Sequence, residues 1–245
     1  MHKRRKSANL TIPGTGRKPT VAFIQTEDGF GIALDDQPAS TPMRRALAVP
    51  SKSLAEAVAA EWQRQGDEIV PRTMPLTQLA VTALDRVEDR REEVIDELAA
   101  YGSTELLCYR AEHPAELARR EHEAWQPLLD WLALRFDAPL AVTSGIVHKP
   151  QNPVTLAALR AAIAARSSWE LAALALAAHA TGSIVLALAL AEERIDAEAA
   201  WSLSLMDELY QAELWGVDPL AVARRESIRN DIVAAQEFLR LLRAS

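Results

Sequence analysis

Residues 171–191, LAALALAAHATGSIVLALALA, run for 21 positions without a charged side chain. An uninterrupted helix of this length would extend about 30 Å at 1.5 Å per residue. A helix that is apolar on every side lies either at the centre of a bundle or in a membrane. We expect one buried central helix here, in which Gly182 leaves room for a closely packed neighbour and His179 is a satisfied core histidine.

The composition of this stretch argues against a membrane span. Most of its apolar residues are alanines, and His179, Thr181 and Ser183 lie near its middle. Glu170 and Glu192 flank it without the basic anchors that are typical of membrane helices. We therefore expect a soluble protein with no stable membrane insertion.

Length and charge restrict the possible classes further. The chain has 245 residues, of which 49% are hydrophobic and 25% charged, enough for two unequal domains. Its single cysteine, Cys108, excludes an internal disulfide framework and agrees with a reducing compartment. Residues 1–20 hold six basic and no acidic side chains, which leaves 21 basic and 34 acidic groups in the other 225 residues, a net charge of −13. An acidic body argues against a nucleic-acid partner.

The first ordered part is predicted to be a small β-rich domain over residues 20–75, after a disordered basic tail at 1–19. Val21, Phe23 and Gln25 alternate with Ala22 and Ile24 before Asp28-Gly29, a typical hairpin turn, and Phe30, Ile32 and Leu34 point to one face of a returning strand. Residues 46–49 are a candidate third strand. A lone hairpin is marginal in water, so a helix should cover it. Leu54, Val58 and Trp62 recur at fourfold spacing after Ser53-x-x-Glu56, a capping-box pattern.

Residues 76–245 are predicted to form a larger all-α, bundle-like domain, which makes the fold class α+β. A helix should begin near Pro75, and another at Pro114 that Pro127 breaks or kinks. The run ELLCYRA, residues 105–111, fits either a strand or a last helical turn. Further helices are expected to start after the capping residues Asn152, Ser167, Asp196 and Asp218, the third of them ending at Gly216.

Motifs for catalysis, cofactors and metals are weak. Cys108 with His113 or His122 would suggest a nucleophile, but its apolar neighbours indicate a buried thiol. The histidines lack HxxxH and HExxH spacing. The segment from Gly14 to Lys18 lacks the spacing of a phosphate-binding loop. We predict no catalytic residue, no cofactor and no metal.

One chemical feature remains, an acidic segment from Glu192 to Gly216 with seven acids and one base, Arg194. Within it, Glu208 and Glu213 would lie about 140° apart on a continuous helix and cannot form a carboxylate dyad. A solvated acidic face is one interpretation. The other is a recognition surface that contains Asp207, Glu208 and Glu213 beside Trp215, since an aromatic ring next to charge is common at contact sites.

Six segments in order resemble the ATP-twelve family of ATP synthase assembly chaperones: MPLTQLAVTALDRV, ELLCYRA, WQPLLDWLA, VTSGI, TGSIVLALALA and QAELWG. The resemblance implies a β-rich N-terminal and an α-helical C-terminal domain. It also implies a non-enzymatic role, in which the protein holds the unassembled alpha subunit and prevents its aggregation. A family glutamate close before Trp-Gly matches Glu213, with Glu208 as the alternative. The chain departs from the family at Asp36-Gln37-Pro38 and Ser40, where the family has Gly-Arg-Pro and a lysine.

The resemblance also sets the expected partner and place. We expect a monomer whose partner is the alpha subunit, in a bacterial cytoplasm or a mitochondrial matrix, with the bacterial cytoplasm favoured because no clear transit peptide is present. The alternatives are an enzyme whose site is built from scattered residues and a purely structural helical scaffold.

Overall fold

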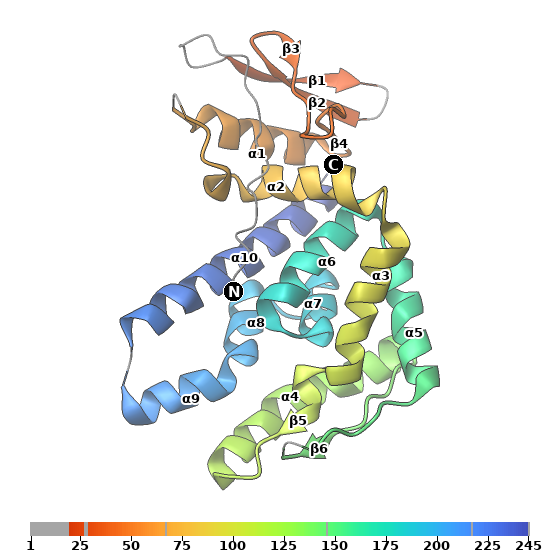
Figure 1. Cartoon of the computed structure of the whole chain (residues 1–245), viewed down its shortest axis with the longest axis vertical. Helices are drawn as coiled ribbons and strands as arrows, with labels where there is room; N and C mark the ends of the chain where they lie inside the picture. Colours follow the sequence, from red (N-terminus) through yellow and green to blue (C-terminus); the bar gives the residue numbers. More distant parts are fainter. Residues whose placement is uncertain (1–19, 27–28, 67, 146, 217, 245) are drawn as a thin grey trace, which may run out of the picture. The chain divides into compact units, whose positions relative to one another are not determined.

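The computed structural model describes residues 20–26, 29–66, 68–145, 147–216 and 218–244 (Figure 1). The chain divides into two compact units. Unit 1 consists of the chain up to Arg90 together with the residues from Glu237 on, and unit 2 of Arg91–Gln236. The boundary predicted at residues 75 and 76 lies earlier than this division, because the helix that begins at Pro75 packs on the first helix of unit 1.

Unit 1 contains a four-stranded sheet centred on β2 (Gly29–Leu34). This strand pairs antiparallel with β1 (Val21–Thr26), β3 (Gln37–Pro38) and β4 (Ala48–Val49). The hairpin prediction is confirmed by pairing from Val21↔Leu34 to Thr26↔Gly29, while Asp28 of its expected turn lies outside the described residues. The third strand is shorter than predicted, and β3 was not predicted.

Helix α1 (Lys52–Gln63) covers this sheet, as expected from its apolar spacing. Leu54, Val58 and Trp62 are all buried. The capping prediction was wrong by two residues: Ser51 is the N-cap, and its Oγ accepts from Leu54 N over 3.2 Å while donating to Leu241 O over 2.6 Å. Ser53 already lies within the helix, where its side chain cannot take the capping position.

Helix α2 (Pro75–Thr82) follows the short helix η1 (Pro71–Thr73) and begins with proline in its first turn, as predicted. Its N-terminus is capped from a distance by the buried Glu61 of α1, which accepts from Leu76 N over 2.9 Å and from Thr77 N over 2.8 Å. The helix continues as the π-helical η2 (Ala83–Val87). Leu84 is half-buried in this segment, whereas Leu76, Leu79, Ala80, Ala83 and Val87 are buried.

Unit 2 is almost entirely helical, which confirms the α+β class with a larger helical part. In chain order its elements are α3 (Arg91–Ala100), η3 (Tyr101–Thr104), η4 (Leu106–Cys108), β5 (Tyr109–Arg110), α4 (Ala115–Phe136), β6 (Thr143–Ser144), α5 (Pro153–Ala164), α6 (Ser168–Thr181), α7 (Ile184–Ala191), α8 (Ala197–Ser204), α9 (Met206–Trp215) and α10 (Pro219–Arg243), whose last turns belong to unit 1. The segment 105–111 combines both options that periodicity left open, a short helix followed by a strand that pairs parallel with β6.

The uncharged stretch 171–191 forms two helices, so the prediction of one continuous helix was wrong. Gly182 ends α6 with a left-handed φ of 70°, and Ser183 then caps α7 by accepting from Leu186 N over 3.0 Å. Gly182 is exposed, and an added Cβ would meet nothing within 4 Å, so its role is conformational and not to admit a neighbour. His179 is also exposed and is not a core residue. All eight residues of α7 are buried, as expected.

The other helix boundaries follow the capping residues closely. Asn152 caps α5, Ser167 and Glu170 form a full capping box on α6, and Asp196 caps α8. The helix predicted from Asp196 to Gly216 is divided at Leu205 into α8 and α9. Pro127 does not break α4, which continues through it for 22 residues. Within the described ranges, no helix is long and apolar enough to cross a membrane.

Candidate functional site

Helix α9 carries all four residues that the sequence singled out: Asp207, Glu208, Glu213 and Trp215. The helix is continuous over ten residues, so the expected angular separation of Glu208 and Glu213 is retained. Each of its three acids faces a different group elsewhere in unit 2. The structure therefore separates the acids instead of gathering them into one carboxylate cluster.

Glu213 forms an ion pair with Arg120 of α4, with 2.9 Å between Oε2 and NH1. Arg120 also contacts Glu116 over 2.9 Å and lies 5.3 Å from the ring centre of Tyr210. The side chain of Glu213 is 57% exposed. An ion pair this accessible to water contributes little to stability, so Glu213 can exchange Arg120 for another cation at low cost.

Glu208 is held more firmly than Glu213, by two arginines of α10. Its Oε2 lies 2.7 Å from Arg224 NH1, and its Oε1 lies 3.8 Å from Nε of Arg225. Arg225 is buried, and its carbonyl accepts from Trp201 Nε1 over 3.0 Å. Glu208 therefore connects α9 to α10 at a partly covered position. This role is structural as well as electrostatic.

Asp207 lies beside a second carboxyl group, Glu121 of α4, which is fully buried. Burial, and next the hydrogen bond with Asp207, raise the pKa of Glu121 to about 7. Glu121 Oε2 accepts from Ala111 N over 2.7 Å, whereas Oε1 has no donor among the described residues. A proton on Glu121 supplies the hydrogen bond to Asp207 that two ionised carboxylates cannot form.

A buried arginine completes the surroundings of Glu121. Arg110 of β5 donates from NH1 to the carbonyl of Glu121 over 2.8 Å and lies 5.1 Å from the ring centre of Trp125. Trp125 in turn donates to Leu203 O over 3.1 Å. Sequence reasoning did not select Arg110 or Glu121. The signal for Glu121 was present, because this acid falls on the apolar stripe of α4 that contains Leu117, Trp125 and Leu128.

The end of α9 and the start of α10 expose four large apolar side chains, and we call this set the α9–α10 corner. Their exposed fractions are 58% for Leu214, 82% for Trp215, 80% for Leu220 and 47% for Val222. Figure 1 shows α9 turning sharply into α10 at this point. Only Trp215 was predicted. The other three belong to the mostly apolar segment LWGVDPLAVA, residues 214–223. This segment ends before the buried apolar residues of α10, which begin at Ile232.

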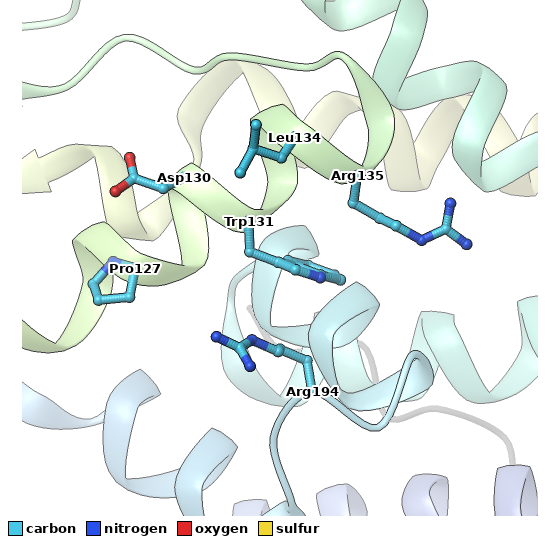
Figure 2. A pocket seen from close by; sticks show the side chains of 6 residues that line it. All are labelled: Pro127, Asp130, Trp131, Leu134, Arg135 and Arg194. Atoms are coloured by element: carbon cyan, nitrogen blue, oxygen red, sulfur yellow. The ribbon is translucent and has the colours of Figure 1, made fainter.

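A second surface feature lies on α4, in a groove of about 560 Å³ that was not predicted from the sequence (Figure 2). We call it the α4 groove. Its lining residues are Pro127, Asp130, Trp131, Leu134, Arg135 and Arg194.

Chemistry of an enzymatic kind has little support in the described residues. Cys108 is buried, and burial raises the pKa of its thiol to about 12, so the nucleophilic thiolate is disfavoured. Among the described residues, no group of three His, Cys, Asp or Glu side chains is placed to hold a metal ion. The segment from Gly14 to Lys18 lies outside the described residues.

Comparison with known proteins gives the family. The model of the ATP12 chaperone protein family matches residues 17–133. Over the whole fold, the chain is 40% identical to the solved Atp12 of Paracoccus denitrificans, with a TM-score of 0.87, covering 91% of this chain and 96% of that one. The chain belongs to the ATP12 chaperone family. ATP12 chaperones act in ATP synthase assembly, which confirms the function indicated by the six sequence segments.

Two further relatives show how widely the similarity extends. The structure of Atu1473 from Agrobacterium tumefaciens is 35% identical, with a TM-score of 0.86, covering 91% of this chain and 84% of that one. Protein atp12 of Schizosaccharomyces pombe, a mitochondrial protein, is 26% identical over 212 residues, which are 81% of this chain and 72% of the relative. Helix α9 lies beyond the residues matched by the family model, so the roles of Asp207, Glu208, Glu213 and Trp215 remain predictions.

Proposed function

We propose that this ATP12 chaperone binds the unassembled alpha subunit of the ATP synthase headpiece through the α9–α10 corner and prevents its aggregation. The observation that carries the proposal is the exposure of Leu214, Trp215 and Leu220, each more than half accessible, in one short segment. Large apolar side chains that cluster on a surface are typical of contact sites. Glu213 and Asp218 are exposed and adjoin this apolar set in the sequence, so they are suited to supply a charged rim.

The physical demands of such a role agree with this surface. A subunit that awaits its neighbour exposes an apolar interface, and a chaperone must cover it and later release it. An apolar centre of moderate size with weak ion pairs at its rim provides contact area without a permanent lock. The exposed Arg120–Glu213 pair fits this requirement, because its dissociation costs little.

The proposal includes a non-enzymatic action by a monomer, in the compartment where the headpiece is assembled. The family relation supports a chaperone over an enzyme or a structural scaffold. The compartment is the bacterial cytoplasm or the mitochondrial matrix. The preference for the bacterial cytoplasm gains no support from the comparisons, since relatives include a mitochondrial yeast protein as well as bacterial ones.

The test is an aggregation assay with purified alpha subunit, diluted from denaturant with and without this protein and without nucleotide. The parent is expected to keep the alpha subunit in solution at stoichiometric amounts. Trp215→Ser and Leu220→Ser should reduce this protection several-fold. Val154→Ser is the matched control, because Val154 is 74% exposed but lies on α5, outside the corner.

Three results would contradict the proposal. The first is aggregation that the parent does not slow. The second is equal protection by the corner variants and the control. The third is nucleotide-dependent turnover of a small molecule with no effect on the alpha subunit, which would favour an enzyme.

A further inference from the structure

The outward face of α4 carries a row of side chains that continues from the Glu213 ion pair into the α4 groove. At about 100° per residue, Arg120, Pro127, Trp131 and Leu134 fall within about 60° of arc, and they extend about 21 Å along the helix. The buried residues Trp125 and Leu132 lie about 130–150° away from this row. The row is therefore a second face of the helix, distinct from the one that enters the core.

This second face is apolar where a solvent-facing row is ordinarily polar. Leu134 is 89% exposed, Pro127 is exposed, and Trp131 is partly exposed. Trp131 contacts Phe136 edge-on, with 5.6 Å between ring centres, which fixes the indole at the groove. In Figure 2, Trp131 extends from α4 toward the segment that carries Arg194. The groove volume of about 560 Å³ lies within the range of about 300–1,000 Å³ found for ligand pockets.

The charges at the groove indicate which partner it fits. Arg135 pairs with Glu192 over 3.1 Å, and Asp130 accepts from Gln126 Nε2 over 2.8 Å. Arg194 also lines the groove, and in the described part of the chain it forms no ion pair within 4.0 Å, although it follows two glutamates in sequence. Glu192 is directed instead to Arg135 and Arg166. An available guanidinium beside an apolar floor favours a carboxylate next to an apolar side chain.

We propose that the α4 groove binds a segment of the client in which an aromatic or branched apolar side chain is followed closely by an aspartate or glutamate. The apolar side chain lies on Pro127, Trp131 and Leu134, and the carboxylate pairs with Arg194. This inference rests on the proposed function, since the client is the alpha subunit. It extends the contact surface along α4, because Arg120, which pairs with Glu213 of α9, lies in the same row of α4 as the groove residues Pro127, Trp131 and Leu134.

Two partly independent contacts on one client would raise the affinity of the chaperone for that client. A second site that binds the same chain acts at a raised effective concentration, so its loss reduces overall affinity by more than its own weak binding suggests. We expect groove variants to weaken capture about tenfold or more without abolishing it. Variants of the corner should have a similar or larger effect.

The experiment measures the dissociation constant of purified alpha subunit for four forms of the full chain: the parent, Leu134→Asp, Arg194→Glu and the control Val154→Asp. Leu134 and Val154 are both highly exposed, so neither substitution is expected to disturb folding, which circular dichroism melts will check. Leu134→Asp and Arg194→Glu should each weaken binding about tenfold. Val154→Asp should match the parent.

A synthetic peptide makes the assignment of the carboxylate specific. An alpha-subunit peptide that contains an apolar-acidic pair, selected by its protection in hydrogen exchange of the complex, should bind the parent. The same peptide with lysine in place of the acid should bind the parent protein more weakly than it binds the Arg194→Glu variant. Equal affinity of both peptide forms for both proteins would contradict the role of Arg194.

The outcomes separate this inference from the proposed function. If the parent does not bind the alpha subunit, both are overturned. If the parent binds it and both groove variants bind equally well, the groove proposal alone is overturned. Concentration-dependent dimers of the parent that Leu134→Asp dissociates, with unchanged client binding, would assign the groove to self-association and also overturn the inference.

Discussion

Arg120 of α4 and Glu213 of α9 form an ion pair with 2.9 Å between NH1 and Oε2, and the two side chains are 40% and 57% exposed. Glu213 is the acid that the family resemblance selects, and the structure gives it a partner within its own chain. Two roles are therefore possible for Glu213, an internal link between helices or a contact with the client. A charge exchange between the two residues distinguishes them.

The first prediction concerns this exchange. Glu213→Lys should reduce capture of the alpha subunit several-fold, because a client cation would meet a like charge. The double variant Arg120→Glu with Glu213→Arg restores the internal ion pair with reversed polarity. If Glu213 meets the client, the double variant should remain as defective as Glu213→Lys in co-purification. Unfolding should differ from the parent by under about 0.5 kcal/mol in each case.

Glu208→Lys serves as the comparison for this experiment. It places a cation beside Arg224 and the buried Arg225, so it should destabilise the protein more than Glu213→Lys does. Full recovery of capture in the double variant would show that Glu213 acts only within the chain. A capture defect confined to Glu208→Lys would transfer the family glutamate to Glu208.

The second prediction concerns Gly182, whose positive φ of 70° divides α6 from α7. Gly182→Ala should lower the free energy of unfolding by about 1–2 kcal/mol, the cost of a left-handed conformation for a residue with a Cβ. Gly182→Asn should cost less, because asparagine tolerates this conformation. Gly182→Leu should resemble Ala, since an added side chain meets open space. Urea unfolding measures all three, and a Leu variant that is far worse than Ala would show that the site is crowded.

Gly182 also shows what a sequence alone can and cannot give. The stretch 171–191 was correctly predicted to be largely buried, because a run without charges has few alternatives. Periodicity could not reveal the break, since residues on both sides are apolar and helical. The pair Gly182-Ser183 carried the missing signal: a left-handed glycine followed by a capping serine ends one helix and starts the next.

The site was predictable only in part, for a related reason. Glu213 and Trp215 were found because acids and aromatic rings stand out in a sequence. Glu121 and Arg110 were missed because their pairing joins α4, β5 and α9, which are distant in the chain. The α4 groove was missed because Pro127, Trp131 and Leu134 have the same spacing as a core-facing row. Only the tertiary structure shows which of two apolar rows faces water.

The third prediction concerns Glu105, which is fully buried at the N-terminus of α7. Its carboxyl accepts from Ser183 Oγ, from Ile184 N over 3.0 Å and from Leu107 N over 3.3 Å. Burial raises the pKa of Glu105 to about 7. The folded state holds the proton more tightly than the unfolded state does. The contribution of Glu105 to the free energy of unfolding is therefore fully present below about pH 4.5. It should decline by up to about 3 kcal/mol as the pH rises to about 7.

Glu105→Gln tests this sign. The amide cannot ionise, so the variant should lack the decline, and the difference in unfolding free energy between variant and parent should change between pH 5 and pH 8. At pH 5 the variant should be less stable by about 1–3 kcal/mol, because its amide group cannot satisfy the same donors. Urea unfolding at several pH values gives both numbers. Parallel pH curves for the two proteins would contradict the raised pKa.

The last prediction concerns Glu121 of α4, whose carboxyl group forms a hydrogen bond with Asp207 of α9. The pKa of Glu121 is raised to about 7, first by burial and next by the hydrogen bond with Asp207. A raised pKa means that the link is complete at low pH and is lost as the pH rises through about 7, when two carboxylates face each other beside Arg110. Helix α9 should then loosen from α4. Amide hydrogen exchange, corrected for its intrinsic pH dependence, should show lower protection of α9 at pH 8 than at pH 6.

Glu121→Gln provides the matched test, because its amide donates to Asp207 at every pH. In this variant, protection of α9 should be nearly the same at pH 6 and pH 8. Glu213→Gln, which removes the ion pair between Arg120 of α4 and Glu213 of α9, should keep the pH dependence of the parent. Such a result would mean that protonation of Glu121 affects the position of the α9–α10 corner, since α9 carries Trp215 at its end. If the Glu121→Gln variant loses as much amide protection of α9 at pH 8 as the parent does, the carboxyl pair does not control this helix.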